Sequence, residues 1–96
     1  MSRNLHPTEG ARFLLERTGD EGASATYRAS VYTPDAVFTS TGTLTEDGSV
    51  ALALTGAPGD LDERLGTIAK LLARDATRRR EDGLVVWPAR IMRWRK

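Results

Sequence analysis

One long amphipathic helix, expected over residues 60–83, constrains the fold of this chain more than any other feature. Its apolar side chains recur at steps of three and four residues and so share a face; they are Leu61, Leu65, Ile68, Ala69, Leu72 and Ala76. Asp60 and Glu63 have the spacing of a capping box, and Gly83 stands where a helix ends in the left-handed conformation. Gly66, inside the helix, suggests a close approach to a second layer. The apolar stripe requires such a layer to cover it.

Residues 11–55 are expected to supply that layer as four strands, because apolar and polar side chains alternate along them. Turn signals separate the strands at residues 19–22, 33–36 and 46–48. Short turns between successive strands predict an antiparallel meander. Its second face, rich in threonine, is expected to be open to water.

The lengths of the loops decide which side chains lie opposite one another. Loops of three, two and three residues gather nearly all large apolar side chains, Leu54 included, on the face that receives the helix. This choice requires Gly48 to be left-handed. The predicted opposite pairs are Gly42–Leu52, Val31–Phe38, Phe13–Tyr27 and Leu15–Ala25.

After the helix, residues 84–87 are short, apolar and β-branched and predict a fifth strand, placed at an edge by Pro88. The expected fold class is therefore α+β: a four-stranded antiparallel meander packed on one face by a single long helix, with a short C-terminal edge strand. The expected organisation is a flexible tail over 1–9, one domain over 10–87 and a basic-aromatic tail over 88–96. A helical tail would align Trp87 with Ile91 and Trp94, whereas an extended one would align Arg90 and Met92 with Trp94.

Length and composition favour one small domain without disulfides. The chain has 96 residues, 40% of them hydrophobic, and no cysteine. It contains no apolar run of the roughly 20 residues that a membrane helix needs, and no signal-peptide pattern, so we expect a cytoplasmic protein without membrane contact. Twelve of the fourteen basic residues are arginine, a bias that suits a GC-rich bacterial genome.

The charge is divided unevenly along the chain. Residues 1–73 carry six basic and ten acidic groups, and residues 74–96 carry eight basic and three acidic ones. Tryptophan and arginine are enriched where proteins bind partners. The candidate partner-binding residues are therefore Arg78, Arg79, Arg80, Arg90, Arg93, Trp94, Arg95 and Lys96. In the alternative interpretation, the two tryptophans cover one end of the core and the arginines offset the helix dipole.

The sequence offers no pattern for catalysis, a cofactor or a metal site. His6 is the only histidine and lacks partners, and the acids at the helix start suit its dipole. Residues 56–59 precede that helix but lack the lysine of a phosphate loop. We expect a small non-catalytic binding or assembly module that binds an unknown protein partner or itself. The alternative is a nucleic-acid-binding accessory protein that uses the basic-aromatic C-terminal segment.

Overall fold

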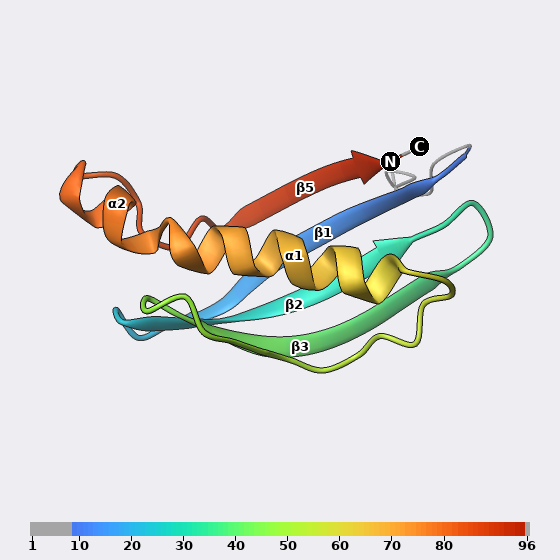
Figure 1. Cartoon of the computed structure of the whole chain (residues 1–96), viewed down its shortest axis with the longest axis horizontal. Coiled ribbons are helices and arrows are strands. Elements are labelled where there is room, and N and C mark those ends of the chain that lie inside the picture. Colours follow the sequence, from blue (N-terminus) through green and yellow to red (C-terminus); the bar gives the residue numbers. More distant parts are fainter. Residues whose placement is uncertain (1–8, 96) are drawn as a thin grey trace.

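Four strands joined by short turns form most of an antiparallel sheet, and a helix lies across one of its faces (Figure 1). The computed structural model describes residues 9–95. Its strands are β1 (Ala11–Asp20), β2 (Ser24–Tyr32), β3 (Val37–Thr45), β4 (Val50–Leu52) and β5 (Arg90–Arg95), and its helices are α1 (Leu61–Arg74) and α2 (Ala76–Glu81). The order in the sheet is β4-β3-β2-β1-β5. The predicted α+β fold class is confirmed, while His6 and residues 1–8 of the predicted N-terminal tail lie outside the described residues.

Two of the three predicted strand registers are correct. Val31 lies opposite Phe38 across the turn at residues 34–35, and Gly42 lies opposite Leu52. Gly48 has φ +95°, the left-handed value that the three-residue loop requires. The hydrophobic pattern therefore set the pairing on both sides of β3.

The predicted β1–β2 register is wrong by four residues. Phe13 pairs with Val31 and Leu15 with Ala29, because β1 continues to Asp20 and the loop lies at residues 21–23. A shift by an even number of residues keeps every side chain on its predicted face, so burial of the apolar face does not distinguish the two registers. An irregularity between Arg17 and Gly19 allows the longer strand to pair to its end.

The N-terminus of α1 does not have the predicted capping box. The Asp60 side chain makes no capping hydrogen bond and instead accepts one from Arg64 Nε at 2.8 Å. The carboxylate of Asp62 accepts hydrogen bonds from the backbone N–H groups of Thr55 and Gly56, each at 3.0 Å, and from the Thr55 hydroxyl at 2.7 Å. Partial burial raises the pKa of Asp62, but these hydrogen bonds lower it more, so that its pKa is below the usual value. Asp62 thereby fastens the connection after β4 to the helix.

The helical region is interrupted at Asp75 instead of continuing as one helix. α1 ends at Arg74, and α2 extends from Ala76 to Glu81. Gly83 then takes φ +71°, and Leu84 N–H donates to Arg79 O, which is the glycine-terminated C-cap predicted from the sequence.

The fifth strand lies later in the chain than predicted. Residues 84–87 form no strand, and residues 90–95 pair antiparallel with β1 at the edge of the sheet. Pro88 cannot donate a ladder hydrogen bond, and it lies in the turn before the strand. The extended alternative for the C-terminal segment is correct, and residues 90–95 belong to the sheet instead of a separate tail.

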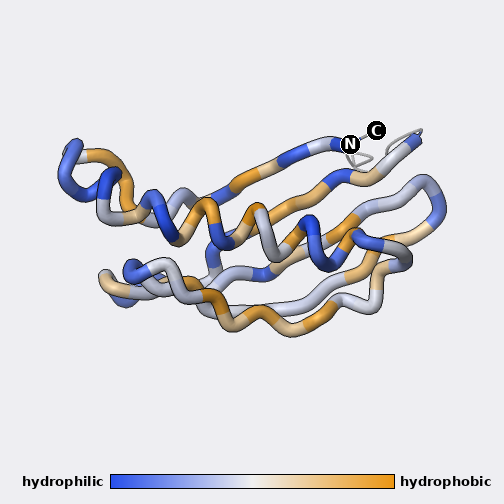
Figure 2. Tube along the Cα trace, viewed as in Figure 1, coloured by the Kyte–Doolittle hydropathy of each residue, from blue (hydrophilic) through white to orange (hydrophobic). Residues whose placement is uncertain are grey.

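The helix stripe and the apolar sheet face form the core as predicted, with few exceptions. Figure 2 shows hydrophobic positions recurring along α1 and along the strands beneath it. The fully enclosed side chains include Tyr27, Val31, Leu44, Leu65 and Trp87. Leu54, by contrast, is 81% exposed, because β4 ends two residues before it.

Gly66 does not mark the close approach that its position suggests. A Cβ added there would meet no atom within 4 Å outside its immediate surroundings. Within residues 9–95, neither helix is long and apolar enough to cross a membrane.

Candidate functional site

The structure divides the predicted basic-aromatic residues between two places. Arg78, Arg79 and Arg80 lie on α2, at one end of the long axis of the molecule, and Arg90 and residues 93–95 lie on β5 (Figure 1). Lys96 lies outside the described residues. Of the α2 arginines, only Arg79 borders the same groove as Arg93 and Arg95.

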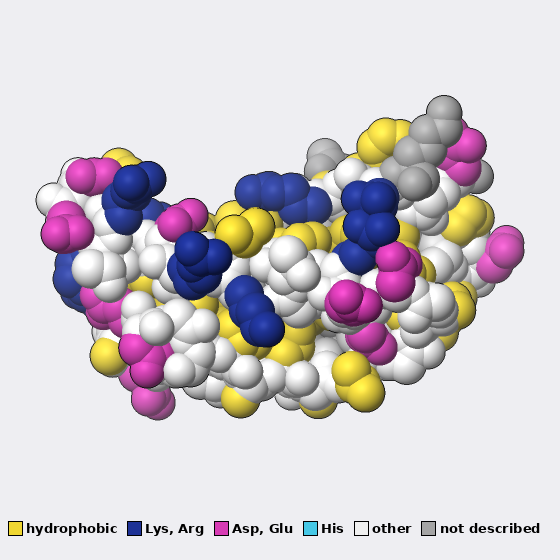
Figure 3. Space-filling model, viewed as in Figure 1, with side chains coloured by type: hydrophobic (Ala, Val, Ile, Leu, Met, Phe, Trp, Pro, Cys, Tyr) yellow, Lys and Arg dark blue, Asp and Glu magenta, His cyan; other side chains and the backbone are white. Residues whose placement is uncertain are grey.

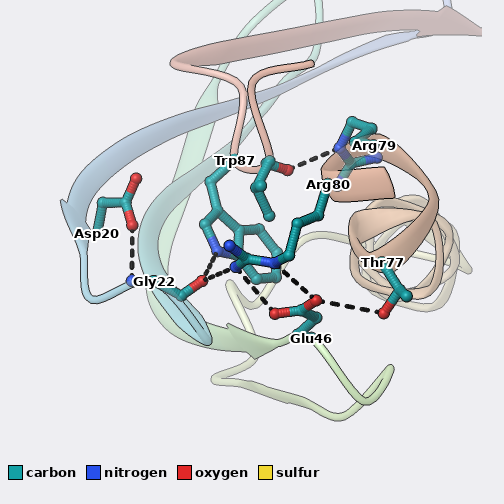
Figure 4. A network of polar contacts seen from close by, with 8 residues as sticks. Asp20, Gly22, Glu46, Thr77, Arg79, Arg80 and Trp87 are labelled. Atoms are coloured by element: carbon teal, nitrogen blue, oxygen red, sulfur yellow. Dashed lines mark hydrogen bonds and ion pairs between the residues drawn. The ribbon is translucent and has the colours of Figure 1, made fainter. Parts of the chain in front are cut away.

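Two of the α2 arginines are engaged in internal contacts. Arg80 donates to both carboxylate oxygens of Glu46, each at 3.0 Å, and to the carbonyl of Gly22 at 3.0 Å (Figure 4). The hydrogen bond from Arg80 lowers the pKa of Glu46. Arg79 donates to the carbonyls of Leu72 and Val86, both at 2.6 Å. Both side chains tie α2 to the rest of the fold, which leaves Arg78 as the outward-facing arginine of the three.

Trp87 is part of the core and not of a binding surface. It is 1% exposed, and its indole N–H donates to Gly22 O at 2.8 Å, beside the Arg80 contact (Figure 4). Tyr27 donates its hydroxyl to Pro88 O at 2.8 Å, and Arg17 donates to Trp87 O. For this tryptophan the alternative interpretation, covering one end of the core, is correct.

A groove lies between α1 and β5, because the helix packs over β1 to β4 but not over β5. Its volume is about 640 Å³. Apolar residues from β1, α1, β5 and the segment before β5 line it; they are Phe13, Ile68, Leu71, Leu72, Pro88, Ile91 and Trp94. Leu71 is 52% exposed, so one wall of the groove is an apolar helix surface in contact with water.

Arginines surround this apolar lining. Arg93 and Arg95 reach the groove from β5, while Arg64 and Arg79 reach it from the helices. Asp75 is the one acidic residue among the lining residues. Figure 3 shows cationic and apolar side chains side by side on this part of the surface.

The arginines of the groove differ in what they already bind. Arg64 forms an ion pair with Asp60 at 2.8 Å, and Arg79 is occupied by backbone carbonyls. Arg93 and Arg95 are exposed and make no ion pair with any described acidic residue. The charges of β5 are therefore open to a negatively charged ligand.

The alternation of β5 divides its side chains between the two faces of the sheet. Arg93 lies opposite Phe13 and Ile91 opposite Leu15, on the helix side. The other face carries Arg90, Met92 and Trp94, which lie opposite Glu16, Leu14 and Arg12. On that face Trp94 is 53% exposed and Met92 is half-buried, so the polar threonine-rich surface has an apolar patch at its β5 end.

The β5 residues of this site were predicted from the sequence, but the α1 residues that form its other wall were not. Leu71, Ile68 and Arg64 face the groove, and Ile68 was assigned wholly to the core stripe. The available signal was Leu71, an apolar residue beside the stripe that widens the apolar face of the helix beyond what one sheet contact needs.

The described residues contain no group of three or more histidine, cysteine, aspartate or glutamate side chains placed to hold a metal ion. No family model matches the chain, and neither a curated protein nor a solved structure matches it.

Proposed function

We propose that this chain is a small non-catalytic binding module of the cytoplasm that holds a segment of a protein partner in the groove between α1 and β5. The observation that carries the proposal is the combination of an exposed apolar lining with arginines that lack acidic partners in the described structure. Binding surfaces typically join an apolar centre to a polar rim rich in arginine.

The size and shape of the groove support binding of a side-chain-bearing segment. A volume of about 640 Å³ falls within the range of pockets that hold organic ligands. The lining offers one carboxylate, Asp75, and no histidine, so acid–base chemistry there would depend on a single group. Binding therefore accounts for these residues better than catalysis.

Fewer of the described residues support the nucleic-acid alternative than the protein-segment proposal. It depends on a continuous surface of arginines with tryptophans that stack on bases. Arg79 and Arg80 are engaged internally, Trp87 is buried, and Trp94 shares its sheet face with Arg90 but not with Arg93. The protein-segment proposal needs only the residues that the groove already brings together.

A selection from a random peptide library tests the proposal. Peptides that enrich on the immobilised protein are measured for affinity against the wild type, Leu71→Glu and Leu54→Glu. Leu71 lies in the groove wall and Leu54 is exposed outside the groove, so both glutamates are tolerated by the fold. We expect Leu71→Glu to weaken binding about tenfold or more, which corresponds to about 1.4 kcal/mol, and Leu54→Glu to change it less than about twofold.

Amide chemical shifts give the position of the bound peptides. Shifts confined to α1 and β5 support the groove as the site. The proposal is wrong if no peptide enriches, if the shifts fall elsewhere, or if the two glutamate variants weaken binding equally.

A further inference from the structure

The outer edge of β5 offers backbone groups with which another strand could pair. Among the described residues, β5 has β1 as its only neighbour in the sheet, and its six residues leave backbone groups unpaired on the other side. The opposite edge of the sheet, β4, is only three residues long. β5 is therefore the longer edge at which another strand can pair.

The charges on β5 oppose pairing with a second copy of itself. In an antiparallel pair that overlaps over all six residues, Arg90 of one copy would lie opposite Arg95 of the other. Like charges directly opposite each other destabilise a strand pair. The three arginines of β5, Arg90, Arg93 and Arg95, favour an edge partner that carries carboxylates, since none of them is paired with a described acidic residue.

We propose that the module binds an extended acidic segment of a protein, which adds to β5 as a sixth, antiparallel strand. This inference rests on the proposed function of the groove and specifies its ligand. Side chains of the added strand alternate between the faces, so those on the helix side lie beside the mouth of the groove. An all-antiparallel sheet favours the antiparallel direction for the new strand.

The residues of β5 specify the order of side chains in the ligand. Carboxylates belong opposite Arg95, Arg93 and Arg90, and apolar side chains opposite Trp94, Met92 and Ile91. Read along an antiparallel ligand, the pattern is acidic, apolar, acidic, apolar, apolar, acidic. A peptide Glu-Val-Glu-Val-Val-Glu, flanked by glycines and blocked at both ends, provides this pattern as a probe.

Backbone methylation tests whether the probe pairs as a strand. In an antiparallel pair, alternate residues direct their N–H groups towards the neighbouring strand. N-methylation of one alternate set should therefore weaken binding to the full chain about tenfold or more, and methylation of the other set should change it less than about twofold. Equal effects of the two sets would overturn strand addition.

A charge exchange tests the register. Arg93→Glu should weaken binding of the probe about tenfold, and a probe with lysine in place of its second glutamate should recover binding to that variant. Arg78→Glu is the matched control, because Arg78 is exposed on α2 away from β5. Absence of recovery, or an equal loss with Arg78→Glu, contradicts the assigned pairing.

Three further outcomes would replace the proposed ligand. An all-lysine probe that binds as tightly as the acidic one removes the charge argument. A single-stranded oligonucleotide that displaces the probe and binds more tightly assigns the site to nucleic acid, with steep salt dependence as its mark. A dimer at working concentration, in which the β5 amides directed away from β1 are protected from exchange, assigns the edge to a second copy. If the probe fails while library-selected peptides still occupy the groove, only strand addition is wrong; if neither binds there, the proposed function is wrong as well.

Discussion

At the scale of single residues, the same amino acid has different roles in different surroundings. Gly66 lies in α1 facing open space, whereas Gly42 lies in β3 opposite Leu52. A Cβ on Gly42 would lie 2.6 Å from the carbonyl oxygen of Ala51 and 2.7 Å from the Cα of Leu52. The sequence shows two glycines inside regular elements, but only the structure shows which of them the packing requires.

Replacing these two glycines by alanine should change stability in opposite directions. Gly66→Ala should raise the free energy of unfolding by about 0.5–1 kcal/mol, because alanine costs less conformational entropy in a helix. Gly42→Ala should lower it by about 1–3 kcal/mol through overpacking against the β4 backbone. Denaturant unfolding of both variants checks the prediction, and a loss of stability in Gly66→Ala would contradict it.

At the scale of elements, polar contacts attach the helical layer and the last strand to the meander. The Tyr27 hydroxyl from β2 holds Pro88 in the turn before β5, and Arg80 holds α2 to Glu46. Burial raises the pKa of Tyr27 to about 12, although Arg17 and Arg79 lower it somewhat. The folded state therefore favours the neutral phenol more than the unfolded chain does.

This pKa gives the contribution of Tyr27 a specific pH dependence. Because its pKa is higher in the folded state, the stability due to Tyr27 is fully present below its ordinary pKa of 10 and is lost as pH rises through about 12. At pH 8, Tyr27→Phe should lose about 0.5–1.5 kcal/mol with the hydrogen bond to Pro88. Unfolding measured at several pH values should show the advantage of the wild type shrinking above pH 10. A constant difference across that range would contradict the assignment.

At the scale of the whole molecule, β5 completes the sheet and also forms one wall of the groove. It covers the edge of β1 and brings Ile91 against the core. The arginines are divided in the same way, since Arg79 and Arg80 of α2 hold the fold together while Arg78 and the arginines of β5 face solvent. Fold stability and the candidate site therefore share this strand.

Truncation after Trp87 should consequently destabilise the protein. Loss of β5 exposes the edge of β1 and removes the Pro88 carbonyl that Tyr27 binds, so we expect a loss of about 3–5 kcal/mol. Trp94→Ser is the control, because Trp94 is half exposed and should cost less than about 1 kcal/mol. Thermal and denaturant unfolding distinguish the two cases; a truncated chain as stable as the wild type would show that β5 is an appendage.

The sequence by itself determined the features that depend on local periodicity. The alternation of apolar residues and the turn at residues 46–48 specified the β2–β3–β4 pairing, and the stripe from Leu61 to Ala76 specified the helix face. These were predictable because a side-chain period and a glycine conformation are local properties of the chain.

Only the tertiary structure decided the features that depend on distant partners. The β1–β2 register stayed ambiguous because an even shift buries the same faces. The predicted capping box is absent because the Asp60 carboxylate accepts a hydrogen bond from Arg64 instead of capping the helix. The position of β5 after Pro88 was not predictable because it depends on pairing of residues 90–95 with β1, a strand far away in the sequence. The groove exists because α1 does not extend over β5, a consequence of packing that no short stretch of sequence contains.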